Sequence, residues 1–167
     1  FNNREDVKSL HMPNSVTTIG EYAFSGTYIN HLVIGKNITE IGESAFSNLY
    51  KCRSITFAAP SALERIPEGC FYRSLVYDQP DACRLEIRPI VKSIGKKAFS
   101  GCKNIGELVL HPGLQSIGKC AFEECAGLKQ LCIPDSVRQI DYAAFSDCNI
   151  KSLTFNASSS LVAIGAR

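Results

Sequence analysis

The phrase Ile-Gly-x-x-Ala-Phe recurs along the whole chain, and this repetition limits the fold more than any other feature. With substitutions, it begins at Ile19, Ile41, Ile66, Ile94, Ile117 and Ile140, and a further copy starts at Ile164. Successive isoleucines are 22, 25, 28, 23, 23 and 24 residues apart. A unit of this length cannot bury a core alone, so we expect the copies to stack as the coils of a solenoid.

An apolar triplet precedes each copy and predicts a strand. In the segment LKQLCI, Leu128, Leu131 and Ile133 have the spacing L-x-x-L-x-L. The last three residues alternate between core and solvent, as in a short strand with one buried face. Leu131 and Ile133 should therefore point inward and Cys132 outward. The strands of neighbouring coils should form one parallel face.

The residue after the isoleucine indicates how the chain turns. It is glycine in five copies, Pro67 in one and Asp141 in another. Proline fixes φ at about −65°, so this position does not require a positive φ. Because Gly, Asp and Pro are all accepted around the start of a helix, we predict that Gly-x-x-Ala-Phe forms a short helical or 3₁₀ turn on the other face of each coil.

The pattern extends over residues 1–167, which predicts a single solenoid domain of about six coils of 22–28 residues. Phe1 occupies the place of the phenylalanine of an earlier copy, and the copy that starts at Ile164 is incomplete. We expect a truncated slice of a longer array, with apolar side chains exposed at both ends because no polar capping repeat covers them.

The regular spacing is broken at residues 72–84. Phe71 and Leu85 are fourteen residues apart where nine is usual, and the inserted segment carries Tyr72 and Tyr77. Insertions in solenoids form loops on one face, often a binding face, so these tyrosines form a candidate loop site. The alternative is a tolerated irregularity whose tyrosines lie at the edge of the core.

The segment LKQLCIPDSVRQIDYAAFSDC, residues 128–148, carries these features together and resembles the BspA-like class of leucine-rich repeats. The resemblance covers essentially the whole chain and implies a leucine-rich-repeat solenoid. It also implies adhesion or protein recognition rather than catalysis, in a cell-surface or secreted protein, and it supplies no catalytic residues. The segment LEIRPIVKSIG, which begins at Leu85, departs from the usual unit and leaves the turn of that coil open.

Composition limits the class of partner. The 18 Lys and Arg residues nearly balance the 16 Asp and Glu residues, which leaves a formal net charge of +2 at pH 7. This balance offers no strong electrostatic footprint for nucleic acid or an anionic membrane. No apolar run approaches the ~18 residues of a membrane span. We therefore expect a protein or peptide partner, no nucleic acid, no membrane insertion and a monomeric chain.

Three of the eight cysteines are evenly spaced. Cys102, Cys125 and Cys148 each follow a repeated phenylalanine by three residues, so they should stack as a ladder. Neighbouring strands lie ~5 Å apart, which is close enough for disulfides. Stacked side chains point in parallel, however, and we therefore favour buried free thiols that act as small apolar groups.

The other cysteines fall into two groups. Cys52 and Cys70 occupy positions that other copies fill with core residues. Cys120 stands at a variable position and Cys132 faces outward on its strand, so these two, together with Cys83, should react first with thiol reagents. No Cys-x-x-Cys pair or zinc-ligand spacing is present, and we expect no metal and no cofactor.

The sequence offers little for catalysis. His11, His31 and His111 lie on or beside the predicted strands, and the repeated phrases supply no nucleophile, histidine and acid together. We therefore expect no catalytic residues. Two segments, which begin at Asn37 and Asn156, match the N-glycosylation acceptor pattern, which matters only in a secreted eukaryotic protein.

The outward side chains of the predicted strands form the remaining candidate site. They are His11, Val33, Thr56, Glu86, Val109, Cys132 and Thr154, flanked by His31, Arg84, Arg88, Glu107, His111 and Gln130. A concave, extended sheet of this kind suits a protein or peptide ligand. The alternative is that β-branched residues occur here because they favour strands. Recognition is the leading hypothesis, a structural spacer is the second, and an enzyme is a remote third.

Overall fold

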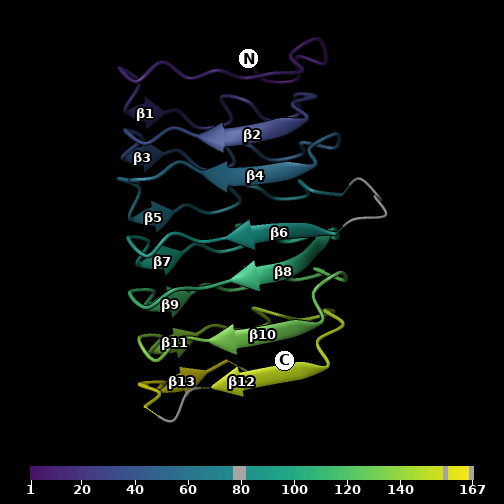
Figure 1. The fold of residues 1–167 in the computed structure, drawn as a ribbon. Coiled ribbons are helices and arrows are strands. Elements are labelled where there is room, and N and C mark those ends of the chain that lie inside the picture. The colour runs from purple at the N-terminus through teal and green to yellow at the C-terminus, as the bar shows by residue number, and fades with distance from the viewer. Residues whose placement is uncertain (77–81, 156–157, 166–167) are drawn as a thin grey trace.

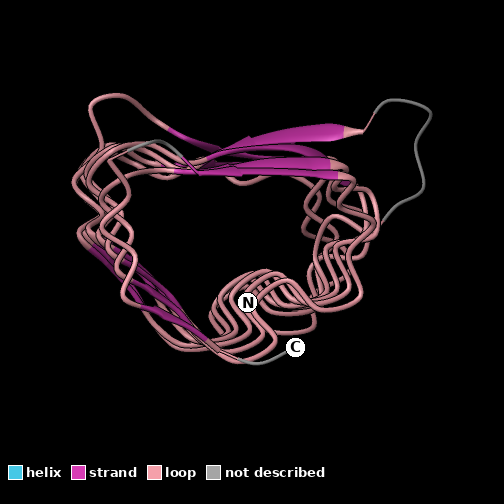
Figure 2. Ribbon diagram, turned by 90° about the horizontal axis from the view of Figure 1, so that it is seen from below, coloured by secondary structure: helices cyan, strands magenta, loops and turns pink. Residues whose placement is uncertain are grey.

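The computed structural model describes residues 1–76, 82–155 and 158–165, which form a stack of coils (Figure 1). Viewed along the stack, the longer strands lie on one side of the coils and the very short strands on another (Figure 2). The predicted leucine-rich-repeat solenoid is therefore confirmed. The described residues contain no helix, so the predicted helical turns are wrong.

The longer strands form the predicted parallel face. They are β2 (His31–Ile34), β4 (Ser54–Phe57), β6 (Cys83–Glu86), β8 (Ile105–Val109), β10 (Gln130–Ile133) and β12 (Ser152–Phe155). They pair in parallel as β2 with β4, β6 with β8 and β10 with β12, so three two-stranded sheets replace the continuous sheet that we expected. The segment around Leu10 and Met12, expected to form a further strand, has none.

A second ladder of two-residue strands ends at the repeated isoleucines. These strands are β1 (Thr18–Ile19), β3 (Glu40–Ile41), β5 (Arg65–Ile66), β7 (Ser93–Ile94), β9 (Ser116–Ile117), β11 (Gln139–Ile140) and β13 (Ala163–Ile164). Five of them form one sheet, in the order β5, β7, β9, β11 and β13, whereas β1 pairs only with β3. Alternation cannot reveal so short a strand, which explains why the sequence analysis missed this ladder.

The ladder breaks between β3 and β5 because of one proline. In regular coils the residue after the isoleucine donates its N–H to the isoleucine of the preceding coil, as from Gly95 N to Ile66 O at 2.8 Å. Pro67 holds this position in the coil of β5 and has no N–H to donate. Ile66 O thus still accepts a hydrogen bond from the next coil, whereas Pro67 donates none to the coil before.

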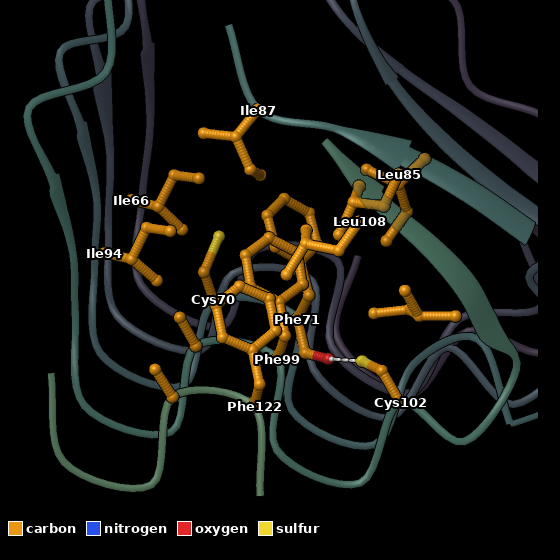
Figure 3. Packing of buried hydrophobic residues seen from close by; sticks show 14 of the residues in the cluster. Ile66, Cys70, Phe71, Leu85, Ile87, Ile94, Phe99, Cys102, Leu108 and Phe122 are labelled. Carbon is orange, nitrogen blue, oxygen red and sulfur yellow. Dashed lines mark hydrogen bonds between the residues drawn. The ribbon is translucent and has the colours of Figure 1, made fainter. Parts of the chain in front are cut away.

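Stacked phenylalanines fill the centre of the coils. The rings of Phe1, Phe24, Phe46, Phe71, Phe99, Phe122 and Phe145 follow one another with centroid separations from 5.0 to 5.7 Å. Figure 3 shows three of these rings between the isoleucines of the short strands and the leucines of the longer strands. Each coil therefore buries its ring against identical rings above and below.

Two left-handed residues per coil explain why the turns are not helical. The first is the residue just before the repeated Ala, and the second is the second residue after the repeated Phe. In the coils from Asn3 to Asp147, the φ angles at these two positions lie between 50° and 75°. Gly69 and Gly101 occupy such positions in neighbouring coils. A residue with positive φ interrupts a right-handed helix, so the segment forms two successive tight turns.

The repeated glycine is selected by close packing between coils. Its φ is not positive, as we predicted. A Cβ at Gly95 would lie 2.7 Å from Pro67 C and from Glu68 N in the coil below. The absence of a side chain therefore lets the backbones of successive coils approach each other.

Apolar side chains are exposed at both ends of the stack, as we expected. Phe1 is 72% exposed at one end, and Val162 and Ile164 are 85% and 62% exposed at the other. Across the residues that the structure describes, no helix is long and apolar enough to cross a membrane.

Candidate recognition surface

The outward side chains of the longer strands lie in register across each strand pair. Val33 pairs with Thr56, Glu86 with Val109, and Cys132 with Thr154. Val33 is 50% exposed, whereas Leu32 and Ile34 on either side of it are buried. The alternation predicted from the sequence is therefore present, and the strand face is defined here as these outward side chains with their flanking outward neighbours.

Glu86 holds together a charged cluster in the middle of the strand face. Its carboxylate accepts hydrogen bonds from Arg84 Nη1 at 2.9 Å and Arg88 Nη1 at 3.5 Å, and it lies 2.8 Å from His111 Nε2. Arg84 Nε also contacts Glu107 Oε1 at 3.2 Å. The charged patch predicted at Arg84, Glu86 and Arg88 thus extends to the neighbouring strand.

Electrostatics favour the ionised form of Glu86. The hydrogen bond from the Arg84 guanidinium, followed by that from His111, lowers the pKa of the Glu86 carboxyl, and partial desolvation opposes this only in part. The Glu86 side chain is 31% exposed. The cluster is therefore a partly covered group of charges that a ligand can reach.

Two hollows lie on either side of the β6–β8 pair. At these places β4 does not pair with β6, and β8 does not pair with β10. The first, of about 190 Å³, is lined by Ile55, Thr56, Phe57, Arg84, Glu86 and Arg88. The second, of about 350 Å³, lies between β8 and β10 and includes Val109, Gln130 and Cys132. A register irregularity between Cys83 and Arg84 accompanies the first interruption. The strand face is consequently grooved rather than flat.

The remaining predicted residues do not join this cluster. His11 is exposed beside the open N-terminal end of the stack. His31 Nδ1 lies 2.9 Å from Ser54 Oγ on β4, a neighbour that the sequence analysis did not identify although both residues start their strands. Tyr72 is half-buried with the Arg73 guanidinium 5.3 Å from its ring centroid. Tyr77 lies outside the described residues.

The geometry offers no assembled catalytic or metal centre in residues 1–76, 82–155 and 158–165. No group of three or more His, Cys, Asp or Glu side chains there could hold a metal ion. His31 and Ser54 form a pair, but no carboxylate of the described residues is hydrogen-bonded to that histidine.

The thiol ladder has a structural role in the core. Cys102, Cys125 and Cys148 are free, and each donates to the carbonyl of the repeated phenylalanine one coil earlier, at 3.1, 3.3 and 3.1 Å. Figure 3 shows this bond from Cys102 to Phe71. Ser74 makes the equivalent bond to Phe46 at 2.7 Å. In four successive coils this position therefore carries a small donor, whereas Leu49 fills it with a buried apolar side chain after Phe46.

Two of the three thiols that we expected to react first are buried. Cys83 lies in the core and Cys120 is only 5% exposed, so the surface placement of Cys120 is wrong. Its short side chain does not reach past the charged groups of Lys97, Lys119 and Glu123, whose fields act on the thiol. Cys132 is exposed, as its place on the strand predicts.

Of the two segments that match the N-glycosylation acceptor pattern, the structure describes only the asparagine of the first. The Asn37 side chain is exposed, and its amide donates to Asn14 O of the preceding coil at 2.7 Å. Asn156 lies outside the described residues. The only structural role visible at Asn37 is thus a bond between coils.

The fold is shared with one of the two solved structures compared below, which has a TM-score of 0.75. A leucine-rich repeat protein from Eubacterium ventriosum is 22% identical with a TM-score of 0.75, and the match covers 86% of this chain and 37% of that one. A leucine-rich cell surface protein from Faecalibacterium prausnitzii is also 22% identical, with a TM-score of 0.48 and coverage of 93% and 58%. The chain thus spans only part of the length of either structure. A comparison with curated proteins finds no matching sequence.

The sequence itself agrees with the coil geometry. The description of the BspA-type leucine-rich repeat region matches residues 1–78 and 84–166 in six copies. These ranges include all strands of both ladders apart from Cys83, the first residue of β6, and they leave out only residues 79–83 and the last residue. The chain therefore belongs to the family of BspA-type leucine-rich repeat proteins.

Proposed function

We propose that this chain is a non-catalytic recognition module that binds a protein or peptide through its strand face. The observation that carries the proposal is the Glu86 cluster, which stands between two hollows; the outward side chains paired across the strands beside it are small or β-branched, namely Val33, Thr56, Val109, Cys132 and Thr154. A protein ligand could contact the cluster by hydrogen bonds and place apolar groups near Val33.

The family supports the same function. BspA-type repeats are associated with adhesion and protein recognition, as the sequence resemblance implies. We extend this to the location of the protein and propose that it acts at the cell surface or after secretion. A ligand of this chain would then be a protein of the surroundings, such as one on a host or neighbouring cell.

A structural spacer is the second candidate function, and one observation favours it. Every coil repeats the same phenylalanine contact, and the ring planes of neighbouring coils differ by only 2–17° among the repeated phenylalanines. Such regular packing makes a stiff rod without any ligand. A spacer would tolerate changes on either face.

The test compares a variant changed on the strand face with a control variant changed on the side of the short strands. A library of displayed random peptides and a panel of extracellular proteins would first be selected against the unchanged chain. The double variant Val33→Lys, Glu86→Arg should then bind the selected ligands at least tenfold more weakly. It places a positive charge at the apolar end of the strand face and reverses the charge of the residue that the cluster shares.

The matched control is Thr18→Lys, Glu40→Arg, which makes comparable changes at exposed positions of β1 and β3. This control should bind as the unchanged chain does. Ligands that survive the strand-face changes while the fold is intact would contradict the proposal. A chain that selects no ligand at all would favour the spacer.

A further inference from the structure

Charge is segregated along a second surface, which is separate from the strand face. We define the short-strand face as the solvent-accessible side chains on the two-residue strands, on the residue before each strand, and on the three residues after each repeated isoleucine. Its first half carries Glu21, Glu40, Glu43, Glu64 and Glu68, and its second half carries Lys92, Lys96, Lys97, Lys119 and Arg138. Arg65 and Asp141 are the exceptions in the two halves. The turns beyond this face are not segregated, since they carry Arg73 in the first half and Glu123, Glu124 and Asp147 in the second.

One row shows the segregation most plainly. The residue two places after each repeated isoleucine is Glu21, Glu43 and Glu68 in three successive coils, and Lys96 and Lys119 in the next two. Equal offsets in a solenoid place these residues one above another. The surface therefore changes sign once, between the coils of β5 and β7.

At the boundary the opposite charges already pair within the chain. Lys92 Nζ lies 2.7 Å from Glu64 Oε2, and Lys96 Nζ lies 2.7 Å from Glu68 Oε1. Farther from the boundary, the described charges of this row form no salt bridge, although the field of Glu43 still acts on Lys96. In the described part of the chain Glu43 forms no ion pair, and the Lys119 ammonium lies 5.2 Å from the Tyr142 ring centroid.

A hollow marks the acidic side of this boundary. It has a volume of about 700 Å³ and lies where the ladder breaks between β3 and β5. Its lining includes the carboxylates of Glu40, Glu43 and Glu68, besides Arg65 and Lys96. The hollow has room for a long cationic side chain, which would reach Glu43.

We propose that the short-strand face binds a second copy of this chain in antiparallel orientation. A two-fold axis between the coils of β5 and β7 sets the acidic half of each copy against the basic half of the other. The coil of Glu43 then faces the coil of Lys119 in the second copy, and this lysine enters the hollow. Parallel copies would instead oppose like charges along the whole row.

The strength of this contact follows from its exposure. Single exposed ion pairs contribute little, and salt screens them. Several pairs acting together, each present twice by symmetry, give weak dimerisation that depends on ionic strength. The strand faces stay free in this dimer, so the inference does not depend on the proposed function. It departs from the monomer that we expected from the near-neutral composition.

Sedimentation equilibrium of the purified chain tests the dimer. At low ionic strength the chain should form dimers, and high salt should return them to monomers. Glu43→Lys and Lys119→Glu should each weaken dimerisation about tenfold, because each turns two attractive pairs into repulsive ones. An equimolar mixture of the two variants should dimerise again, since every altered charge then meets its opposite.

The control is Lys129→Glu, which makes the same charge change just before β10 and away from this face. It should leave dimerisation unchanged. A chain that is monomeric at low salt, or variants whose mixture does not recover, would overturn the inference. Association that grows with salt and proceeds beyond dimers would also overturn it, since contact between the exposed apolar ends would produce that behaviour.

Discussion

At the scale of single residues, this fold places narrow demands on three kinds of position. The repeated phenylalanine needs a flat ring, the third residue after it is a small donor in the four coils from Ser74 to Cys148, and the residue after the isoleucine needs to leave room for a neighbouring backbone. Cys102 and Ser74 satisfy the second demand with different chemistry. The cysteines are therefore explained by packing, without disulfides or metal.

Gly95→Ala should destabilise the chain by about 1–3 kcal/mol, because the new Cβ would meet rigid backbone of the coil below. Asp141 shows that a coil can adjust to a side chain at this position, so the variant should still fold. Gly20→Ala is the control, since nothing lies within 4 Å of its Cβ. Urea denaturation checks both, and equal stability of the two variants would refute the packing argument.

Thiol titration tests the ladder. All eight cysteines should react in denaturant, because they are free. In the native chain Cys132 should react first, whereas burial raises the pKa of the Cys102 thiol well above its usual range and that of the Cys52 thiol to about 12. Fewer than eight thiols in denaturant would reveal a disulfide and contradict the ladder.

At the scale of strands and turns, the repeat predicts some elements and hides others. Leu131 and Ile133 alternate with Cys132 clearly enough to predict the strand and its buried face. The two-residue strand that ends at Ile140 is too short for any periodicity. The turns were predicted as helical because Gly, Pro and Asp can all start a helix.

The candidate site was predictable only in part. Alternation along the chain predicts that Arg84, Glu86 and Arg88 all face outward, but the contact from Glu86 to His111 depends on a register that follows an insertion and a bulge. Neither of these can be derived from period alone. The hollow between β4 and β6 adjoins the same insertion, whereas the hollow between β8 and β10 lies between regularly spaced coils and has no signal in the sequence.

Glu86→Gln should change how stability depends on pH. The native pKa of Glu86 is below its ordinary value, so its carboxylate stabilises the fold above the unfolded pKa, and this stability is lost as the pH falls through the native pKa. The variant should be less stable at pH 7 and converge with the unchanged chain in acid.

Chemical denaturation at several pH values measures this difference. The effect at pH 7 should be about 1 kcal/mol or less, because the pairs of the cluster are partly exposed. Glu40→Gln serves as the control, since it is exposed and belongs to no cluster of the strand face. A constant difference across pH would mean that the ion pairs of Glu86 contribute nothing.

At the scale of the whole molecule, stability comes from contacts between neighbouring coils. Phe99→Ala should cost about 3–5 kcal/mol, since it opens a gap in the middle of the ring stack between Phe71 and Phe122. Phe1→Ala should cost little, because that ring is 72% exposed. Thermal unfolding followed by circular dichroism checks both, and a small effect of Phe99→Ala would argue against the ring stack as the core.

The two long surfaces of the molecule divide the proposed roles. The strand face combines a partly covered charged cluster with grooves, which suits a protein or peptide other than a second copy of this chain. The short-strand face combines two opposite charge fields, which suits a second copy. A solenoid can carry both because its coils present different sides to solvent along the same stack.

The central claim is recognition through the strand face, and Cys132 provides its most direct test. This thiol is exposed on the strand face, beside the hollow between β8 and β10. A ligand selected by the unchanged chain should slow maleimide labelling of Cys132 in proportion to its occupancy, and prior labelling with a bulky maleimide should block that ligand. Unchanged labelling with the ligand bound, together with unchanged affinity of the labelled chain, would contradict the claim.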